Sequence, residues 1–464
     1  MWLSTMALLT GCQQVCVGVG CEEDYEAAEL TVWSGSTLPQ SGEADRAQAA
    51  PPIAGTEADG PNWSIAWSPG NLLIGSSTGS NVRSIATASV EQTTGDADGI
   101  IRGASSSDAF GHNIRSFADA TGETALLVSA PLHSGGASSR HNGAVYAFSG
   151  LGQRFTGTFD TLDADLRING SESGARFGET VAICPDLDGD GENEWLVAAT
   201  RSSESAELGG AVVLIGSVER EAIGAQTGSA AFARRWTSGA LGARAGHALL
   251  CRDDLTNDGV PDLVIGAPFA DAPDGTDAVG AVYVISGAGL PEAGDLADVA
   301  VHAMYGSESN DWLGYSLATG DIDGDGSPDL IVGAPGTDNA RGSVRIWLQA
   351  DDLSNTPSST LLGTADGDGF GHAVEAGDLN GDGIADLVVG APYLNPTADQ
   401  ETFDAGSMFV FYGDSSWSTA TGRTSDASIV GNKQYQRTGA RFAVGDVDAD
   451  GLADILSVQR TAAP

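Results

Sequence analysis

Five segments of the chain place acidic or amide side chains at the same spacing. The most regular one carries Asp321, Asp323, Asp325 and Asp329 at positions 1, 3, 5 and 9 of a loop, and the glycines between them allow the backbone to turn sharply. Four carboxylates this close repel one another, and a hard divalent cation that takes oxygen ligands removes the repulsion. The spacing therefore predicts a calcium-binding loop, whereas a solvated acidic turn is the alternative for a single copy.

The other four segments repeat this order, and each stands just before a short run of aliphatic residues. Their residues at positions 1, 3, 5 and 9 are Asp186, Asp188, Asp190 and Glu194; Asp254, Thr256, Asp258 and Asp262; Asp378, Asn380, Asp382 and Asp386; and Asp446, Asp448, Asp450 and Asp454. The first positions of successive copies are 57 to 68 residues apart, which indicates a repeat architecture. We therefore expect up to five calcium ions.

The charge of the chain excludes several classes of partner. Its 464 residues include 63 acidic and 21 basic side chains, which gives a formal net charge of −42. Because phosphate binding requires clustered lysines and arginines, we expect neither nucleic acid nor an anionic membrane surface as a partner. We expect a soluble protein that is extracellular or is exposed to salt.

Around each acidic loop the sequence predicts four short strands. A Phe-Gly-like turn, such as Phe370-Gly371, precedes the first strand, and a run that ends in Gly-Ala-Pro follows the loop. A strand of the type Gly-x-Val-Tyr-Val and a strand that ends in glycine complete the repeat. Four short strands separated by glycine turns are typical of a β-propeller blade. Two early repeats, with loops near residues 68–71 and 119–124, keep the strands without the ligands, and we expect no calcium there.

The two ends of the chain supply the two halves of one blade. The last repeat ends after its second strand, and the strands that it lacks are present at residues 29–35 and 51–55. Pairing these segments closes the ring and leaves no exposed sheet edge. The sequence thus predicts an all-β, seven-bladed propeller over residues 29–464. If residues 13–61 are instead a disordered tether, the ring has six blades.

The first 28 residues have the features of a targeting segment. Residues 1–11 resemble a signal peptide, and Leu9-Thr10-Gly11-Cys12 resembles a bacterial lipobox, in which the cysteine becomes lipidated. Residues 12–28 are then an acidic tether, and a lipid on Cys12 would hold the protein at the cell surface as an outer-membrane lipoprotein. Because the apolar run carries no basic residue, either the true start lies upstream or the resemblance is accidental. No other stretch is long enough to cross a bilayer.

The remaining cysteines are even in number, as expected in an oxidising compartment. Cys16 and Cys21 could close a local loop. Cys184 and Cys251 stand two and three residues before equivalent acidic loops of neighbouring repeats. A disulfide between these repeats and two separate buried thiols both fit this placement.

Taken together, the elements of the repeat resemble the FG-GAP repeats of the integrin α-subunit propeller. The Phe-Gly turn, the Asp-x-Asp-x-Asp-Gly-x-x-Asp loop and the Gly-Ala-Pro run occur in the same order over about residues 29–460. The resemblance implies calcium in loops on one face of the propeller and partners on the opposite face.

The resemblance also completes the expected ligand set of each loop. The backbone ligands that it implies at position 7 are the carbonyl oxygens of Glu192, Val260, Ser327, Ile384 and Leu452. Thr256 replaces a carboxylate, so its loop should bind calcium most weakly. The flexible coordination shell of calcium should tolerate Glu194 at position 9.

No catalytic set stands out, and we predict that the chain is not an enzyme. Gly75-Ser-Ser77-Thr-Gly79 matches Gly-x-Ser-x-Gly, but no helical pattern follows, as that motif requires. His112, His247 and His372 each follow the glycine of a Phe-Gly-like turn, which favours structural roles. The predicted function is a calcium-stabilised binding or adhesion scaffold for an unknown protein or glycan. The alternatives are a calcium-dependent propeller enzyme of the polysaccharide lyase or phospholipase type and a purely structural envelope lipoprotein.

Overall fold

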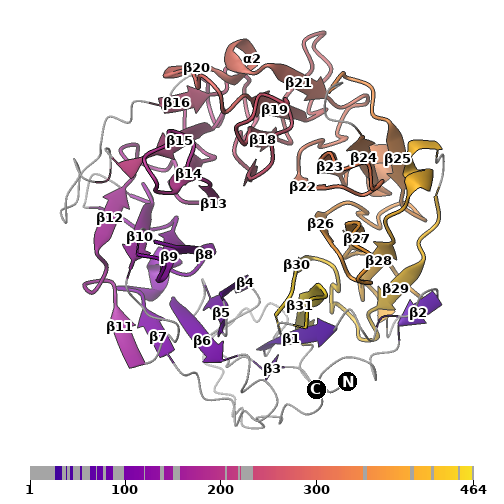
Figure 1. Ribbon diagram of the computed structural model, residues 1–464, viewed down its shortest axis with the longest axis horizontal. Coiled ribbons are helices and arrows are strands. Elements are labelled where there is room, and N and C mark those ends of the chain that lie inside the picture. The colour runs from indigo at the N-terminus through magenta and orange to yellow at the C-terminus, as the bar shows by residue number, and fades with distance from the viewer. Residues whose placement is uncertain are drawn as a thin grey trace, which may run out of the picture.

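The strands of the computed structural model lie in sheets that are arranged as a ring around a central opening (Figure 1). The residues that the structure describes are 27–33, 38, 42–44, 53–54, 63–68, 71–76, 80–86 and 99–461, except 120, 136–139, 150–156, 204–205, 218–219, 221–233, 349–352, 398–401, 420–422 and 448–449. These residues form seven sheets of four or five strands. The prediction of an all-β propeller is confirmed.

Six of the sheets follow the chain from an innermost strand outward. They are β4 (Trp63–Ser68), β5 (Asn71–Ser76), β6 (Asn81–Ala86) and β7 (Gly99–Arg102); β8 (Ile114–Ala118), β9 (Thr124–Ala130), β10 (Ala144–Phe148) and β12 (Leu166–Asn169); β13 (Thr180–Cys184), β14 (Glu194–Ala199), β15 (Ala211–Ile215) and β16 (Arg234–Thr237); β17 (Ala248–Cys251), β18 (Leu263–Ala267), β19 (Ala281–Ile285) and β21 (His302–Tyr305); β22 (Ser316–Gly320), β23 (Asp329–Ala334), β24 (Ser343–Trp347) and β25 (Ser359–Leu362); β26 (Ala373–Gly377), β27 (Asp386–Ala391), β28 (Ser407–Phe411) and β29 (Ala427–Val430). Neighbouring strands within each set are antiparallel.

The seventh sheet joins the two ends of the chain, as the sequence predicts. Its inner strands are β30 (Arg441–Gly445) and β31 (Asp454–Thr461), and its outer strands are β1 (Ala27–Trp33) and β3 (Ile53–Ala54). Strand β1 pairs antiparallel with β31 along its whole length, with Thr31 opposite Ser457. The N-terminal strands therefore cover the edge that β31 would otherwise expose.

Three sheets gain a fifth strand that the sequence analysis does not anticipate. These strands are β2 (Gly42–Ala44), β11 (Gly157–Asp160) and β20 (Ala293–Asp295), and they pair in parallel with β29, β7 and β16. Each lies in the connection between the third and fourth strands of the following sheet. The connection thus reaches back and ties the outer edges of two neighbouring sheets together.

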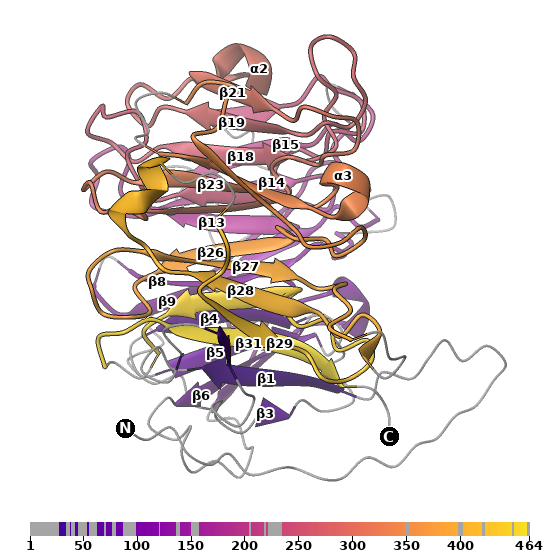
Figure 2. The same cartoon turned by 90° about the vertical axis from the view of Figure 1, so that its right-hand side faces the viewer.

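The hydrophobic core lies between neighbouring sheets. Each buried cluster draws residues from two adjacent sheets, as for the cluster that contains Trp236 and the strands from β13 to β19. Trp33, Trp236, Trp347 and Trp417 are the largest fully buried side chains among the described residues. The helical turns α2 (Leu296–Val299) and α3 (Thr337–Ala340) and the 3-10 turns η5 (Ser106–Asp108) and η8 (Ser415–Thr419) are short connectors. Figure 2 shows the strands of successive sheets layered across the side of the ring.

Glycines explain why the Phe-Gly turn and the Gly-Ala-Pro run recur together. Gly371 in the turn has φ +86°, a backbone conformation that favours glycine. Gly333 in the preceding sheet lies so close that a Cβ atom added to it would stand 2.0 Å from the carbonyl oxygen of Gly371. Gly390 and Gly439 repeat this approach at the same distance. The repeat therefore needs both glycines to bring adjacent blades into contact.

Candidate metal centres

The acidic loops connect the innermost strand of a sheet to its second strand. The loop at residues 186–194 lies between β13 and β14, and the other four lie between the corresponding strands of their sheets. All five therefore lie at the same end of the blades. The Phe-Gly-like turns precede the innermost strands and lie at the opposite end.

Backbone hydrogen bonds shape each loop around its first aspartate. Asp186 accepts hydrogen bonds from the N–H groups of Gly189 and Gly191, at 2.7 and 2.8 Å. Asp321 accepts the equivalent bonds from Gly324 and Gly326, at 2.8 and 2.9 Å. The glycines, which have positive φ, let the backbone curl over one carboxylate while the other carboxylates converge on the same side.

The residue at position 9 anchors each loop in the sheet. Glu194, Asp262, Asp329, Asp386 and Asp454 are all at most 1% exposed. In four loops, one oxygen of the position 9 carboxylate accepts a hydrogen bond from the N–H of position 2. In the first loop, Leu187 donates this bond to Glu194 at 2.6 Å. Burial is the main reason that the pKa values of Glu194 and Asp386 are raised to about 7. A buried carboxylate beside other carboxylates is unfavourable unless a positive charge compensates it.

Three of the loops bring their carboxylates close enough to hold one metal ion. In each group, one oxygen from every member lies within 4.8 Å of the others. The groups are Asp186, Asp188, Asp190 and Glu194; Asp254, Asp258 and Asp262; and Asp321, Asp323 and Asp325. Oxygen-only donors of this kind suit a hard divalent cation.

Glu194 provides the clearest sign that a cation fits. Its Oε1 atom is buried and has no hydrogen-bond partner, although Glu194 lies within a group of four carboxylates. An unpaired buried carboxylate oxygen is costly, and a cation is the partner that the surrounding acids would favour. Asp329, by contrast, is outside the group formed by the other acids of its loop and accepts a hydrogen bond from Ile322 at 2.9 Å.

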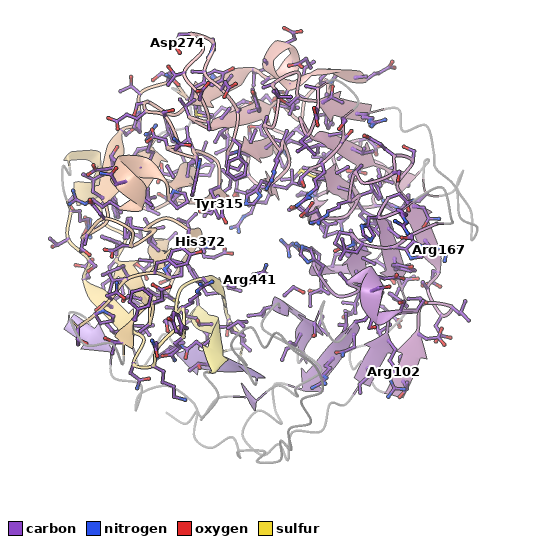
Figure 3. All side chains as sticks on the ribbon, turned by 180° about the vertical axis from the view of Figure 1, so that it is seen from behind. Arg102, Arg167, Asp274, Tyr315, His372 and Arg441 are labelled. Carbon is purple, nitrogen blue, oxygen red and sulfur yellow. A yellow bond between two sulfur atoms is a disulfide. The ribbon has the colours of Figure 1, made fainter. Side chains whose placement is uncertain are left out.

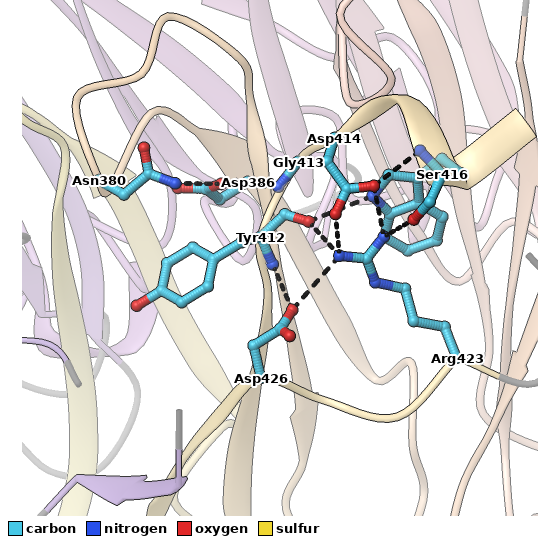
Figure 4. Close-up of polar contacts among 9 residues, drawn as sticks. Asn380, Asp386, Tyr412, Gly413, Asp414, Ser416, Arg423 and Asp426 are labelled. Carbon is cyan, nitrogen blue, oxygen red and sulfur yellow. Dashed lines mark hydrogen bonds and ion pairs between the residues drawn. The ribbon is translucent and has the colours of Figure 1, made fainter. Parts of the chain in front are cut away.

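The fourth loop differs because it carries an amide at position 3. Asn380 accepts a hydrogen bond from the N–H of Asp382 at 2.9 Å, and its Nδ2 atom lies 3.4 Å from Asp386 (Figure 4). Gly413 donates to the same carboxylate oxygen of Asp386 at 2.8 Å. In this arrangement the amide nitrogen, and not the amide oxygen, is directed at the position 9 carboxylate, so ligation by Asn380 requires the amide to turn over.

Arg423 neutralises the acids just beyond the fourth loop. It contacts Asp414 at 2.9 Å and Asp426 at 3.4 Å, and its guanidinium lies 4.6 Å from the ring centre of Trp417. Its hydrogen bond holds the pKa of Asp414 down at about 2. These two acids are therefore paired within the chain.

The structure describes some of the remaining predicted ligands, and others lie outside the described residues. Asp446 accepts from the N–H of Gly451 at 3.0 Å, but Asp448 lies outside the described residues. Thr256 donates its hydroxyl to Asp258 and Asp262, at 3.0 and 3.1 Å, and so links the acids of the second loop. The position 7 carbonyl groups remain a prediction.

Two serines beside the loops escaped the sequence analysis. Ser217 and Ser286 follow the third strand of their sheets, and their hydroxyl groups contact Asp190 and Asp258 at position 5. Both hydroxyls lower the pKa of the aspartate that they contact. Their regular place after a Val-rich strand is the signal that could have identified them.

A disulfide links the first two acidic loops. Cys184 ends β13 and Cys251 ends β17, and the two are joined with a Cα–Cα distance of 4.8 Å. This resolves the alternative of two separate thiols. The bond fixes two neighbouring innermost strands directly before their loops begin.

A cavity of about 700 Å³ runs along the innermost strands at the central opening, from His247 at the end opposite the acidic loops to Cys251 and Arg252 at the loop end. His112, His247 and His372 line it, together with Tyr315 and Arg441. Tyr315 lies between two of the histidines, with ring centres 4.5 Å from His247 and 4.9 Å from His372. Residues from five different sheets thus meet at the central opening.

Comparisons with known proteins agree with this arrangement. A family model described as FG-GAP-like repeat matches residues 321–389, and one described as FG-GAP repeat matches residues 250–285. The chain contains FG-GAP repeats.

The curated proteins that this chain resembles include phospholipases and integrins. The chain is 35% identical to bovine phosphatidylinositol-glycan-specific phospholipase D over 175 residues, or 36% of this chain and 20% of the relative. It is 34% identical to integrin alpha-5 of Xenopus laevis over 152 residues, 32% of this chain and 14% of the relative, and 36% identical to mouse integrin alpha-IIb over 150 residues, 31% and 14%. The match thus spans about a fifth or less of these relatives, which include both a phospholipase and integrins.

Solved structures resemble the ring more distantly. The structure of BBS1N in complex with ARL6DN superposes with a TM-score of 0.46 at 10% identity, over 86% of this chain and 91% of that chain. The Dos1 propeller superposes with a TM-score of 0.43 at 13% identity, over 85% and 76%. Among the described residues, no helix has the length and apolar character needed to cross a membrane.

Proposed function

We propose that this FG-GAP propeller is a calcium-stabilised binding scaffold that works outside the cell. The observation that carries the proposal is the group of Asp186, Asp188, Asp190 and Glu194, in which a buried carboxylate oxygen has no partner within the chain. A calcium ion would supply that partner in the folded protein alone, because the unfolded chain does not hold the four carboxylates together. Calcium would then stabilise the fold by mass action.

Two further features support a location outside the cell. The disulfide between Cys184 and Cys251 suits an oxidising compartment. Calcium sites of extracellular modules bind at roughly 10⁻⁴–10⁻³ M and are filled at the millimolar calcium found there. The predicted lipid anchor at Cys12 and the predicted tether lie outside the described residues. Fatty-acid labelling of the unchanged chain and of Cys12→Ser in a bacterial host tests the lipid anchor separately.

A calcium titration tests the scaffold. At 1 mM calcium we expect each occupied loop to add roughly 0.4–1.4 kcal/mol to the free energy of unfolding, which excess EGTA removes. Asp188→Asn should lose part of the gain, whereas Asp298→Asn, which changes an exposed acid on α2 away from the loops, should keep all of it. A melting temperature that does not respond to calcium or EGTA contradicts the proposal.

The aromatic side chains at the opposite end favour binding as the role of the propeller. Trp312 stacks near Tyr315 with ring centres 6.5 Å apart, and Phe269 contacts both Trp312 and His247. Such surfaces offer large, rigid contact area to a protein or glycan. An array of glycans and proteins, probed with and without calcium, would identify the ligand.

One observation favours an enzyme as a second candidate. His247, Tyr315 and His372 form a contacting set of proton donors and acceptors inside a cavity, away from the acidic loops, and the hydroxyl of Tyr315 lies 3.4 Å from Nε2 of His372. Such a set could move a proton to or from a bound substrate. Turnover of polysaccharide or phospholipid substrates that disappears in Tyr315→Phe would favour this candidate over a pure scaffold.

A further inference from the structure

Three arginines, Arg115, Arg252 and Arg441, and one acid, Glu375, line the central cavity of a protein whose net charge is −42. Arg441 is the first residue of β30 and lines the cavity. Figure 3 shows Tyr315, His372 and Arg441 around the central opening, whereas Arg102, Arg167 and Asp274 lie at the outer edge. Three histidines on three other sheets lie close enough to Arg441 for its positive charge to help lower their pKa values.

More arginines than acids surround these histidines. Besides Arg441, the charges that act on the histidines and on Tyr315 come from Arg176, Arg244, Arg437 and Glu179. Arg176 forms a salt bridge with Glu179 at 3.2 Å, and Arg437 is 3.9 Å from Asp404. Arg244 forms no salt bridge within the described residues. Its guanidinium lies 5.1 Å from the ring centre of Phe269.

The histidines add polar groups to the opening without adding charge. Burial first, and then the arginines, hold the pKa of His112, His247 and His372 at about 4, so all three are neutral at physiological pH. A neutral imidazole can donate and accept one hydrogen bond each. The opening thus combines fixed cations with neutral groups that can bind hydroxyls.

We propose that this opening binds an acidic glycan, a chain of sugar rings that bear carboxylate groups. Guanidinium groups pair with carboxylates in charge-assisted hydrogen bonds, for which Arg244 and Arg441 are the donors. The faces of Tyr315 and Trp312 offer apolar surface to the sugar rings, and the imidazoles offer partners to the hydroxyls. The volume of about 700 Å³ lies within the range of small-molecule sites.

The inference rests on the proposed function, since it names the ligand class of the binding scaffold. It places that ligand at the end of the innermost strands opposite the acidic loops. Calcium is therefore expected to stabilise the ring that carries the opening without contacting the glycan. Failure of either idea can be recognised separately if binding and the calcium melt are measured on the same sample.

The test is calorimetric titration of the full chain, at fixed calcium and 50 mM salt, with a galacturonate hexamer. Two ligand controls accompany it: the methyl-esterified hexamer, which has the same rings without the charges, and a glutamate hexamer, which has the charges without the rings. We expect the free acid to bind at least about tenfold more tightly than either control, because a charge-assisted hydrogen bond is stronger than one between neutral groups.

Two variants test the residues, and a third serves as a matched control. Arg244→Gln and Arg441→Gln should each weaken binding of the hexamer by about tenfold or more. Arg102→Gln, at the exposed outer end of β7, removes the same charge far from the opening and should bind like the unchanged chain. An unchanged calcium-dependent melt shows that each variant still folds.

Three results would overturn the proposal. They are equal binding of the acid and its ester, glutamate binding as tight as galacturonate, and full binding by both Arg244→Gln and Arg441→Gln. The second result would mean that the opening selects an acidic peptide. If the glycan binds as expected but the melt ignores calcium, the calcium scaffold is wrong and the glycan site stands.

Discussion

Glu194 accepts a hydrogen bond from the backbone N–H of Leu187 with one carboxylate oxygen, at 2.6 Å, while its other carboxylate oxygen is buried without a partner in the described part of the chain. The first contact is one that a neutral side chain could also make. The second oxygen is the one to which the proposed calcium ion would bind. The two oxygens would therefore separate a folding role of position 9 from a role toward calcium.

Glu194→Gln should stabilise the calcium-free protein and destabilise the calcium-loaded protein. The amide can still accept from Leu187, and it removes a buried charge whose pKa is raised to about 7 by burial and by Asp188 and Asp190. In EGTA the variant should be more stable than the unchanged chain, by about 1 kcal/mol. In calcium it should be less stable, because the loop loses a ligand.

The measurement is the free energy of unfolding from denaturant melts in both conditions. Asp298→Asn, on α2, controls for the removal of one negative charge from an acidic protein. If Glu194→Gln has the same sign of effect with and without calcium, the carboxylate has no role toward the ion.

Breaking the Cys184–Cys251 disulfide should destabilise the ring without abolishing the fold. The bond closes a segment of 67 residues, for which the chain-entropy model gives roughly 4 kcal/mol. The double change Cys184→Ser and Cys251→Ser, compared with the unchanged chain in denaturant melts, should show a loss of about 2–4 kcal/mol. A reducing agent should lower the stability of the unchanged chain by a similar amount and leave the double variant unaffected; equal stability in all four samples contradicts this.

Removal of the N-terminal strands should open the ring. Strand β1 pairs with β31 over seven residues, and Trp33 at its end is 1% exposed. Deletion of residues 1–33 should expose the edge of β31 and bury one large aromatic fewer, so we expect aggregation and a lower melting temperature.

Deletion of residues 1–26 is the matched control, because it stops just before β1. This shorter deletion should remain monodisperse in light scattering and melt like the full chain. A ring that tolerates loss of residues 1–33 equally well does not depend on β1 for closure.

Repetition made the blades and the loops predictable. Aspartates recur at positions 1 and 5 of all five loops, and a glycine follows at position 6 of each, so one physical reason for their spacing applies to five sites. Chain closure was predictable for a similar reason: the segment that became β1 resembles the third strand of other repeats. Sequence patterns were therefore sufficient to predict structures that are local or that recur in several repeats.

Features that depend on neighbouring sheets were not predictable in this way. The strands β11 and β20 are three or four residues long and pair with a different blade, so no alternation of polar and apolar residues marks them. Tyr315 and His372 are 57 residues apart and meet only after the ring forms. The orientation of the Asn380 amide depends on its hydrogen bonds with Asp382 and Asp386, which the spacing does not specify.

The cavity histidines should make the stability of the protein fall in mild acid. The pKa of His372 in the folded chain is about 4, against 6.5 for an ordinary histidine, because of burial and the charge of Arg441. Between these two values the unfolded chain binds a proton that the folded chain does not. The free energy of unfolding therefore decreases as the pH falls from 6.5 to 4, and it is not affected by His372 above that window.

His372→Gln isolates this contribution from the many carboxylates that titrate in the same range. The difference in unfolding free energy between the unchanged chain and the variant should move in favour of the variant as the pH falls from 7 to 4, by on the order of 3 kcal/mol. His302→Gln, on the outermost strand β21, controls for the loss of a histidine as such. Denaturant melts at several pH values give the difference directly, and a constant offset between the unchanged chain and His372→Gln across that range would show that His372 takes up its proton in the folded ring as readily as in the unfolded chain.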